Sequence, residues 1–497
     1  MKTKYLLFVL ALWVSTCACT TPDEEIPEVK ASFTSFSLMA ENNEGATMGY
    51  VEATISDGKV EAHSAMIIDP SRLVATFTTD GVEVYVGDRK QESGKTINDF
   101  TEPVTYSILS SSGHRTEWTV TLANTGIPTI IINTPKKALV PPKTEDWLEN
   151  TEVRIILPDG TVDYDSSVAN IRGRGNSTWT FPKKPYALKL DEKASILGMP
   201  KHKRWVLLAN WLDRTSLRNH IAFHIARQTD LEWTPRGEFV ELFLNGKHKG
   251  CYYLCEQIKI DQNRVNISEP SDSNPSGGYL MELDVYFDEA YKFHSPMMNM
   301  PYMFKDPDEV TTAQFDYMQN YITELETALC DDEGLLAGDY KEYLDVDSFI
   351  DWWLVHELTG NTEPYHPKSS YMHKDADGKL KAGPVWDFDW ETFVPYKASQ
   401  YSITGAIYYG RLFADPSFVK RVKERWEILK PRFDTVAEFI DSEAERLAPA
   451  IETNIVMWPI DVEVNRDEKM TYKEAVTRLK SSYLAKLRWL DQKIKAM

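Results

Sequence analysis

Strand-like runs and turn signals fill the first quarter of this 497-residue chain, whereas long helical patterns fill its last part. Short β-type runs such as Val82–Val86 recur between residues 31 and 125, and others such as Val153–Leu157 follow after residue 130. Residues 418–497 have apolar positions at helical spacing. A chain of this length is also too long for one ordinary core. The order predicts a multidomain protein, with an all-β sandwich over residues 31–125 followed by an α+β domain with two lobes over residues 130–497.

For one helix, the sequence predicts both the N-terminal and the C-terminal end. Residues Phe349–Leu358 have a helical apolar pattern, and Asp345 or Asp347 can cap its N-terminus. Gly360 stands where such a helix would stop, because glycine readily adopts the left-handed conformation that ends helices. Residues 472–495 form another long helical pattern. Helices are therefore expected late in the α+β domain.

The first residues have the features of a secretory signal peptide. Lys2 and Lys4 precede an apolar run that is too short to span a bilayer, and small residues follow up to Cys19. We expect residues 1–19 to be the signal peptide and Cys19 to carry a lipid, with ordinary cleavage and secretion as the alternative. Residues 20–30 form an acidic tether that resembles the export signals of surface lipoproteins in Bacteroides-like bacteria. The prediction is an exported outer-membrane or cell-surface lipoprotein that contacts the membrane only through its lipid anchor.

The overall charge argues against a nucleic-acid partner. Lys and Arg number 55 and Asp and Glu number 75, which gives a formal net charge of −20. Nucleic-acid phosphates bind basic surfaces, so no nucleic acid is expected as a partner. An odd number of cysteines remains after the leader, which argues against a disulfide framework. Cys251 and Cys255 are expected to be buried apolar side chains.

A glycine-containing turn is the first candidate for phosphate binding. It lies in residues 171–179, between two predicted strands, and includes Arg174 and Asn176. Such a turn brings backbone N–H groups close to a phosphate, so Arg174 and Asn176 are candidate cofactor-binding residues. A plain hairpin with a basic exposed face explains the same pattern.

The strand after this turn supplies a candidate lysine. Residues Tyr186 to Lys189 resemble the Val-Ala-Ile-Lys strand of protein kinases, whose lysine pairs with nucleotide phosphates. Strand alternation places Ala187 and Lys189 on one face and their neighbours on the other. We therefore expect Lys189 to face a nucleotide, with Lys184 as the reserve candidate.

Two aspartates between aromatic residues form the candidate metal site. Asp387 and Asp389 lie in the segment Trp386–Trp390, where two carboxylates at i and i+2 can share one face of a strand end. Carboxylate oxygens suit Mg²⁺, which would bridge nucleotide phosphates. Two alternatives stay open: turn or cap aspartates, and the carboxylate pair of a glycoside hydrolase.

Several phrases together closely resemble the spore coat protein H (CotH) kinase-like family over residues 130–497. The phrases occur in one order: Arg172 to Ser177, Lys183 to Tyr186, Gly198 to Pro200, Trp205 to Asn210, Leu217 to Asn219 and Trp386 to Asp389. The resemblance implies a divergent protein-kinase-like fold that uses Mg²⁺ and ATP to phosphorylate extracytoplasmic proteins. Residues 31–125 resemble the immunoglobulin-like spacer domains of surface lipoproteins in Bacteroides-like organisms.

The resemblance also implies roles for individual residues. Asp387 would act in catalysis and would hold Mg²⁺ together with Asp389, and Glu256 matches a family phrase near the nucleotide. In the loop of residues 357–371, Glu363 stands where active relatives place the catalytic aspartate, and Ser369 stands where they place a metal-binding asparagine. These two departures put the rate of transfer in question, because glutamate displaces its carboxylate and serine is a poorer Mg²⁺ ligand.

The sequence thus predicts an exported, lipid-anchored atypical protein kinase. It would transfer the γ-phosphate of ATP to Ser or Thr of an unidentified extracytoplasmic protein. The alternative is a non-catalytic surface module for adhesion or polysaccharide binding on a degenerate kinase fold, with a glycan as partner. The 14 Trp and 24 Tyr of the chain are compatible with it, because aromatic faces suit sugar rings.

Overall fold

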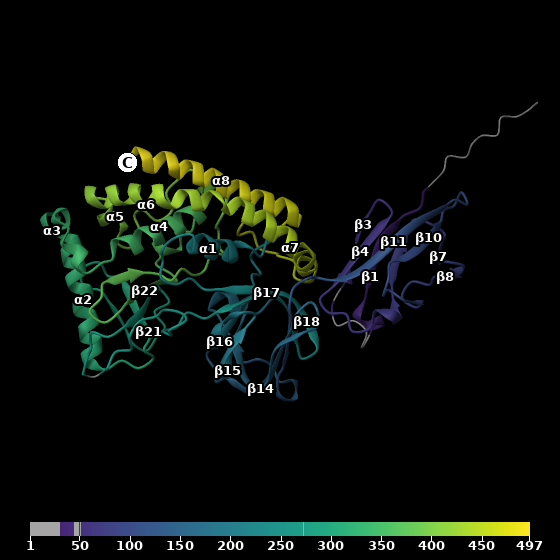
Figure 1. Cartoon of the computed structure of the whole chain (residues 1–497), viewed down its shortest axis with the longest axis horizontal. Helices are drawn as coiled ribbons and strands as arrows, with labels where there is room; N and C mark the ends of the chain where they lie inside the picture. Colours follow the sequence, from purple (N-terminus) through teal and green to yellow (C-terminus); the bar gives the residue numbers. More distant parts are fainter. Residues whose placement is uncertain (1–29, 44–48, 50, 272) are drawn as a thin grey trace, which may run out of the picture.

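The computed structural model describes residues 30–43, 49, 51–271 and 273–497. The predicted signal peptide, Cys19 and nearly all of the acidic tether lie outside these residues. Within the described ranges, no helix is both long enough and apolar enough to cross a membrane. From the N-terminus onward, the chain forms a β-rich part, a β-barrel and a mostly helical part (Figure 1). A multidomain chain with β-rich and helical parts in this order agrees with the prediction.

The β-rich part contains three sheets. The larger two have the strand orders β3-β4-β11-β10-β7-β8 and β2-β1-β6, and β5 pairs with β9. Aromatic residues fill the core that the larger sheets share, and the ring of Phe33 contacts four other rings. The immunoglobulin-like assignment of this part stays a prediction. The strands are β1 (Phe33–Leu38), β2 (Val51–Glu52), β3 (Thr54–Ser56), β4 (Lys59–Ser64), β5 (Leu73–Val74), β6 (Thr76–Thr79), β7 (Glu83–Val86), β8 (Arg89–Lys90), β9 (Ile97–Asn98), β10 (Val104–Leu109) and β11 (Arg115–Asn124).

Seven strands then close into a barrel in the order β12-β13-β14-β15-β16-β18-β17. A parallel pairing of β12 with β17 completes the ring. Apolar side chains fill its interior, as is usual for a barrel of this size. The sequence predicted strands here but not their closure. The strands are β12 (Thr129–Asn133), β13 (Leu148–Ile156), β14 (Val162–Gly173), β15 (Tyr186–Ile196), β16 (Met199–Leu208), β17 (Gly237–Leu244) and β18 (Lys247–Glu256).

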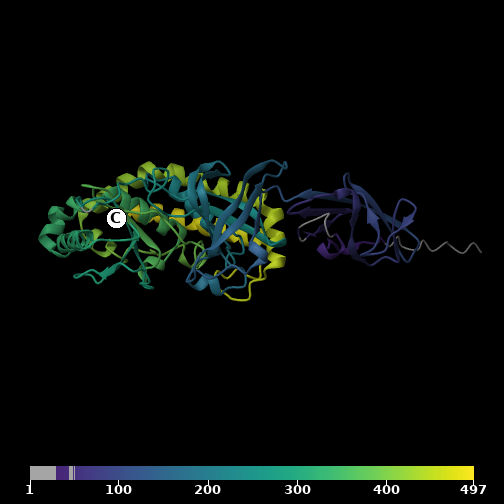
Figure 2. The same cartoon turned by 90° about the horizontal axis from the view of Figure 1, so that it is seen from below.

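The last part combines a second sheet with helices. Helix α1 (Arg218–Arg227) lies between β16 and β17 in the sequence, and the five-stranded sheet has the order β20-β21-β19-β22-β23. In two views at right angles, α7 and α8 extend from the helical part across the barrel (Figures 1 and 2). The other elements are β19 (Tyr279–Leu283), β20 (Lys292–His294), β21 (Pro301–Asp306), α2 (Thr312–Cys330), α3 (Asp332–Ala337), α4 (Val346–Thr359), β22 (Ser370–Lys374), β23 (Leu380–Ala382), α5 (Tyr409–Leu412), α6 (Pro416–Asp434), α7 (Val436–Met457) and α8 (Tyr472–Ala496).

Local predictions for the helices and cysteines are confirmed. The side chain of Asp345 caps α4 by accepting from the N–H of Ser348, and Gly360 ends the helix with φ of +72°. Helix α8 covers the predicted range and begins with a capping box. Cys251 and Cys255 are buried free thiols on β18.

Candidate active site between the barrel and the helical part

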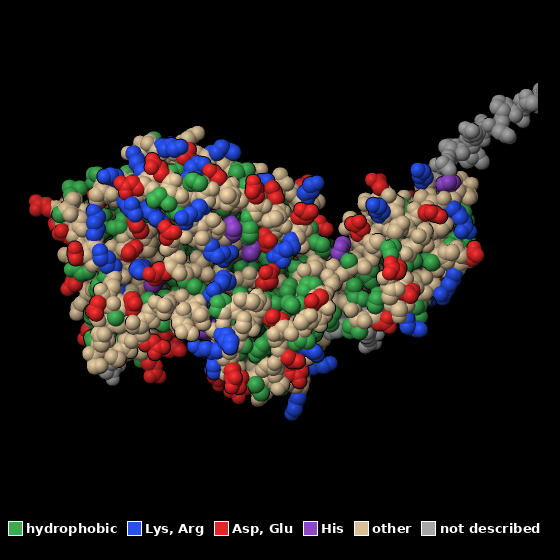
Figure 3. Space-filling model, viewed as in Figure 1, with side chains coloured by type: hydrophobic (Ala, Val, Ile, Leu, Met, Phe, Trp, Pro, Cys, Tyr) green, Lys and Arg blue, Asp and Glu red, His purple; other side chains and the backbone are tan. Residues whose placement is uncertain are grey.

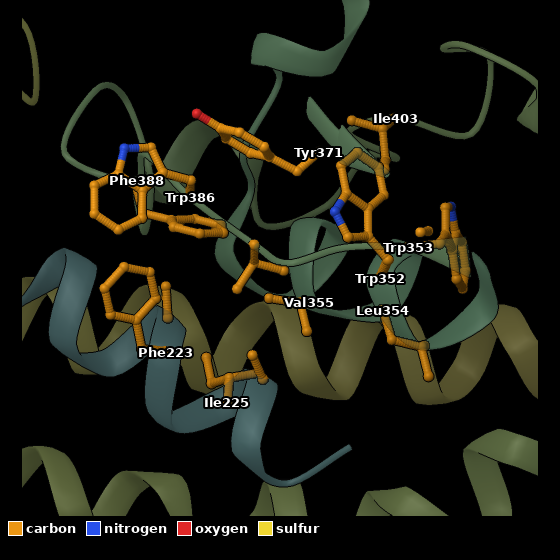
Figure 4. Packing of buried hydrophobic residues seen from close by; sticks show 14 of the residues in the cluster. Phe223, Ile225, Trp352, Trp353, Leu354, Val355, Tyr371, Trp386, Phe388 and Ile403 are labelled. Carbon is orange, nitrogen blue, oxygen red and sulfur yellow. The ribbon is translucent and has the colours of Figure 1, made fainter. Parts of the chain in front are cut away.

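In the segment 386–390, Trp386 and Phe388 pack into the core, whereas Asp387 and Asp389 face a cleft. The rings of Trp386 and Phe388 pack on Phe223 of α1, with centroids 5.7 and 6.3 Å apart (Figure 4). Asp387 and Asp389 line the cleft. The segment is not a strand end as predicted, because β23 stops at Ala382 and Asp387 has φ of +66°. Such left-handed backbone is strained for a non-glycine residue and concentrates at functional sites.

Three asparagines hold the backbone of this segment in place. Asn219 Oδ1 accepts from the N–H of Phe388 at 2.9 Å, and Asn361 Nδ2 donates to the carbonyl oxygen of Asp387 at 3.1 Å. Asn465 Nδ2 donates to the carbonyl oxygen of Asp389 at 2.9 Å. A side-chain amide can replace the hydrogen bonds that regular structure would have supplied. Sequence reasoning missed these roles, although Asn219 lies in a quoted phrase and Asn361 lies in the loop considered for catalysis.

A buried ion-pair cluster lies under the segment. The Arg218 side chain, which is fully buried, contacts the carboxylates of Asp213 and Asp467, and its Nε donates to the carbonyl oxygen of Thr392 at 3.1 Å. This cluster joins α1 to the loop before α8 and to the end of the carboxylate segment. Sequence reasoning did not find it, because Arg218 and Asp467 lie 249 residues apart.

Glu363 completes a group of three partly buried carboxyls. Its N–H donates to Asn361 Oδ1 at 3.0 Å, and its Oε2 is buried with no hydrogen-bond partner among the described residues. Burial, and then the charges of Asp387 and Asp389, raise the pKa of Glu363 to about 9. Burial also raises the pKa values of Asp387 and Asp389. Within the described chain, none of the three carboxyls forms an ion pair with a cationic side chain.

Ser369 also lies at this group. Its Oγ donates to Asp387 Oδ2 at 3.4 Å, and its N–H donates to Asp284 Oδ2 at 3.1 Å. Like Asp387, it has left-handed backbone, with φ of +44°. The structure thus brings together the predicted residues Glu363, Ser369, Asp387 and Asp389. It adds Asp284, which follows β19 and was not predicted.

The cleft has a cavity of about 450 Å³ between the barrel and the helical part. Its charged side chains include acids and bases in equal number. The acids are Glu282, Asp284, Asp288, Glu289, Asp308, Glu363, Asp387 and Asp389, and the bases are Lys143, Arg172, Arg174, Lys183, Arg204, Lys259, Lys305 and Lys368. A cleft with this lining suits a ligand that carries anionic groups and a metal cation together.

The glycine turn reaches this cleft with Arg174 and Asn176. The Arg174 guanidinium lies over the Trp386 ring, 4.8 Å from its centroid, and forms no ion pair within the described chain. The turn requires glycine at position 175, where φ is +79° and a Cβ would lie 1.9 Å from Thr178 Oγ1. Two strands and this turn therefore place the guanidinium of Arg174 in the same cleft as the three carboxyls, and its role in phosphate binding stays a prediction.

Three predicted cofactor residues do not line the cleft in the described structure. Lys184 Nζ donates to the carbonyl oxygen of Trp179 at 2.7 Å. Glu256 is fully buried and accepts two side-chain hydrogen bonds from Arg236, at 2.9 and 2.8 Å. Lys189 shares a face with Ala187, as predicted, and lies opposite Arg204 in the strand pair, but it does not line the cleft. Strand alternation determines the face of the sheet from which Lys189 projects. It does not determine how far Lys189 lies from the cleft.

Lys183 lines the cleft instead, but its ammonium group is already bonded. Its Nζ donates to the carbonyl oxygens of Ala209 and Cys251, the first at 2.9 Å. Burial lowers the pKa of Lys183 to about 8. We assign it a structural role at the floor of the cleft.

The donor atoms fit Mg²⁺ that is shared with a phosphate ligand. No group of three or more His, Cys, Asp or Glu side chains in the described ranges is arranged to hold a metal alone. Mg²⁺, however, commonly takes one or two carboxylates and completes its shell with water and phosphate oxygens. Asp387, Asp389 and the unpartnered Glu363 Oε2 supply hard oxygen atoms whose mutual repulsion a cation would relieve.

Comparisons with known proteins include the part of the chain that forms this site. The sequence model of the family described as CotH kinase protein matches residues 171–490, more than half of the chain. No curated protein matches the sequence. A solved structure, described as a candidate glycoside hydrolase from Bacteroides thetaiotaomicron, is 12% identical, covers 59% of this chain and 88% of its own, and has a TM-score of 0.17. Similarity at that TM-score supports no statement about fold or function. The family match contains the glycine turn, the carboxylates and the three asparagines, and the chain therefore belongs to the CotH kinase protein family.

Proposed function

We propose that the chain is an exported, lipid-anchored atypical protein kinase of two lobes, which transfers the γ-phosphate of ATP to Ser or Thr of extracytoplasmic proteins. The observation that carries the proposal is the arrangement of three partly buried carboxyls and a guanidinium without an ion pair in one cleft. Glu363, Asp387 and Asp389 lie on the helical side, and Arg174 lies on the barrel side. Membership of the CotH kinase protein family supports the same reaction class.

Each side chain has a role that follows from its position. Asp387 and Asp389 would hold Mg²⁺, which when bound neutralises charge on the phosphates. Arg174 would pair with phosphate oxygens, because its guanidinium donors are free of ion pairs within the described chain. Glu363 Oε2 has no partner; a bound cation would lower the pKa of this carboxyl, and the ionised oxygen would then accept the proton of the acceptor hydroxyl. Ser369 would hold Asp387 in orientation through its hydroxyl.

The test measures phosphate transfer and nucleotide binding in the same samples. Purified protein is incubated with Mg²⁺ and labelled ATP, and the midpoint of thermal unfolding is recorded with and without Mg²⁺-ATP. Wild type should label a protein acceptor and unfold at a higher temperature with the nucleotide. Asp387→Asn should lose both effects, whereas Asp165→Asn, an exposed aspartate on β14, should keep both. Equal behaviour of wild type and Asp387→Asn would refute the proposal.

A non-catalytic surface module is the second candidate, and exposed aromatic rings favour it. Tyr286, Tyr365 and Trp390 are 47%, 51% and 45% exposed, and all three lie within a few residues of the cleft carboxyls in the sequence. Exposed aromatic faces suit sugar rings. Stabilisation of the protein by oligosaccharides together with no response to Mg²⁺-ATP would favour this function over the first.

A further inference from the structure

Three cations share the outer face of the barrel, and two of them, Arg172 and Arg204, line the cleft. Lys189 on β15 pairs directly with Arg204 on β16, and Arg172 on β14 pairs with Ala187, two residues before Lys189. Directly opposite residues, and residues two apart on a strand, project from the same face of a sheet. Alternate residues such as Leu188 fill the barrel interior, so the cations lie on the outer face. We name Arg172, Lys189 and Arg204 the outer basic patch.

The outer basic patch lacks bonded counter-charges. Within the described chain, none of its side chains forms an ion pair or a side-chain hydrogen bond, although acids outnumber bases in the sequence. Glu289 attracts Arg172 and Asp308 attracts Arg204, but Glu289 is ion-paired with Lys305, and Asp308 with Lys259. Like charges directly opposite each other destabilise a sheet. Such an arrangement indicates a surface that is completed by an anion.

An aromatic ring orients the two arginines. The guanidinium carbons of Arg172 and Arg204 lie 4.4 and 5.0 Å from the centroid of the Trp147 ring. A guanidinium group that lies over a ring keeps its edge N–H donors free for an oxygen ligand. The ring therefore holds the donors ready without using them. Figure 3 shows Lys and Arg side chains along the border between the barrel and the helical part.

The patch lies beside the proposed transfer site. Arg172 and Arg204 line the same cleft as Arg174 and Asp387. Arg172 is two residues before Arg174, about 7 Å along an extended chain. An extended peptide that crosses the mouth could therefore contact the patch a few residues away from its reacting hydroxyl. Three cations held together match a dianion better than a single carboxylate, and forked donors match phosphate oxygens.

We propose that the outer basic patch binds a phosphate group already present on the acceptor, so that the preferred substrate is a phosphorylated Ser/Thr segment. This inference rests on the proposed kinase function for its biological meaning and on the patch alone for binding. The same chemistry would also attract inorganic phosphate. A peptide adds contacts along the cleft, whereas the free ion has only the patch.

Calorimetry without ATP tests binding directly and separates it from phosphate transfer. The probes are a flexible Ser-, Gly- and Ala-containing peptide, the same peptide with one phosphoserine, and inorganic phosphate. Wild type should bind the phosphopeptide about tenfold or more tightly than either other probe. The variant with Arg172→Gln, Lys189→Gln and Arg204→Gln should lose this preference. Lys247→Gln removes an exposed lysine at the start of β18, and this control variant should keep the preference.

Two results would overturn the inference. One is equal affinity of wild type for the phosphopeptide and the unphosphorylated peptide or inorganic phosphate. The other is an unchanged preference in the triple variant. Arg204→Lys keeps the charge and removes the fork, so an intermediate preference is expected and guards against a folding defect in the triple variant. Because no ATP is present, the calorimetric result does not depend on phosphate transfer. Failure of the proposed kinase function and failure of this inference can therefore be told apart.

Discussion

Two groups of acids, one buried and one partly buried at the cleft, lie next to each other in this molecule and differ in how their charge is compensated. In one, Arg218 lies between Asp213 and Asp467 and contacts both. In the other, Asp387 and Asp389 lie with Glu363 and form no ion pair within the described chain. The first group has the composition of a structural brace, because a buried charge is stable only when it is paired. The second has the composition of a binding site, because its charge is balanced only when a cation arrives.

The largest effect on stability should come from removing Arg218, the cation that compensates Asp213 and Asp467. Arg218→Ala leaves two buried carboxylates without a partner, and we expect a loss of about 3–5 kcal/mol in the free energy of unfolding. Urea unfolding measures it. Arg154→Ala is the matched control, since its ion pair with Asp165 is solvent-exposed and contributes about 1 kcal/mol or less. Similar losses in both variants would show that the Arg218 cluster is not a brace.

Removing a carboxylate from the group of Glu363, Asp387 and Asp389, which has no ion-pair partner within the described chain, should have the opposite effect on stability. Asp389→Asn removes one of three repelling carboxyls, so the free energy of unfolding without ligand should stay the same or rise. Phosphate transfer should fall by about 100-fold or more, because a ligand for the metal is lost. Unfolding curves and initial rates on the same preparation decide the matter. A destabilised variant that keeps its rate would reverse the assignment of the two groups.

The asparagine scaffold should have a smaller effect than either charge group. Asn219→Ala leaves the buried N–H of Phe388 without an acceptor, which should cost about 2 kcal/mol of unfolding free energy. Asn133→Ala, whose bond to Glu152 is exposed, should change it by less than about 0.5 kcal/mol. The transfer rate should also fall in Asn219→Ala, because the adjacent Asp387 loses its fixed backbone. If only the stability changes, the scaffold does not position the carboxylates.

The smallest expected effect concerns Lys183, a buried cation with no carboxylate partner. Burial lowers its pKa to about 8 in the folded protein, so between pH 8 and its ordinary value near 10.4 the unfolded chain binds more protons. Stability should therefore rise with pH in this window, by about 1 kcal/mol per pH unit relative to Lys183→Met. Denaturation series at pH 8, 9 and 10 measure the difference. A constant difference between the proteins would show that Lys183 stays charged when folded.

Local patterns predicted what depends on neighbours in the sequence. The caps of α4 at Asp345 and Gly360, and the shared face of Ala187 and Lys189, follow from dihedral preferences and strand alternation. The carboxylates of the segment 386–390 were recognised because aromatic residues alternate with acids there.

Features built from distant segments could not be predicted in this way. The barrel closes through β12 and β17, which are about a hundred residues apart in the sequence, and the hydrogen bond from Phe388 to Asn219 spans 169 residues. Lys189 shows the same limit on a small scale. Its face is a local property, but its distance from the cleft depends on where the helical part meets the barrel.

The left-handed backbone of Asp387 has a consequence for how the family can change over time. Besides aspartate, the residues that most readily adopt this conformation are glycine and asparagine, and each is reached from an aspartate codon by one nucleotide change. Both would keep the loop in its shape and remove the negative charge. Lineages can therefore lose the proposed phosphate transfer at this position in a single step while the protein still folds and can take on another role.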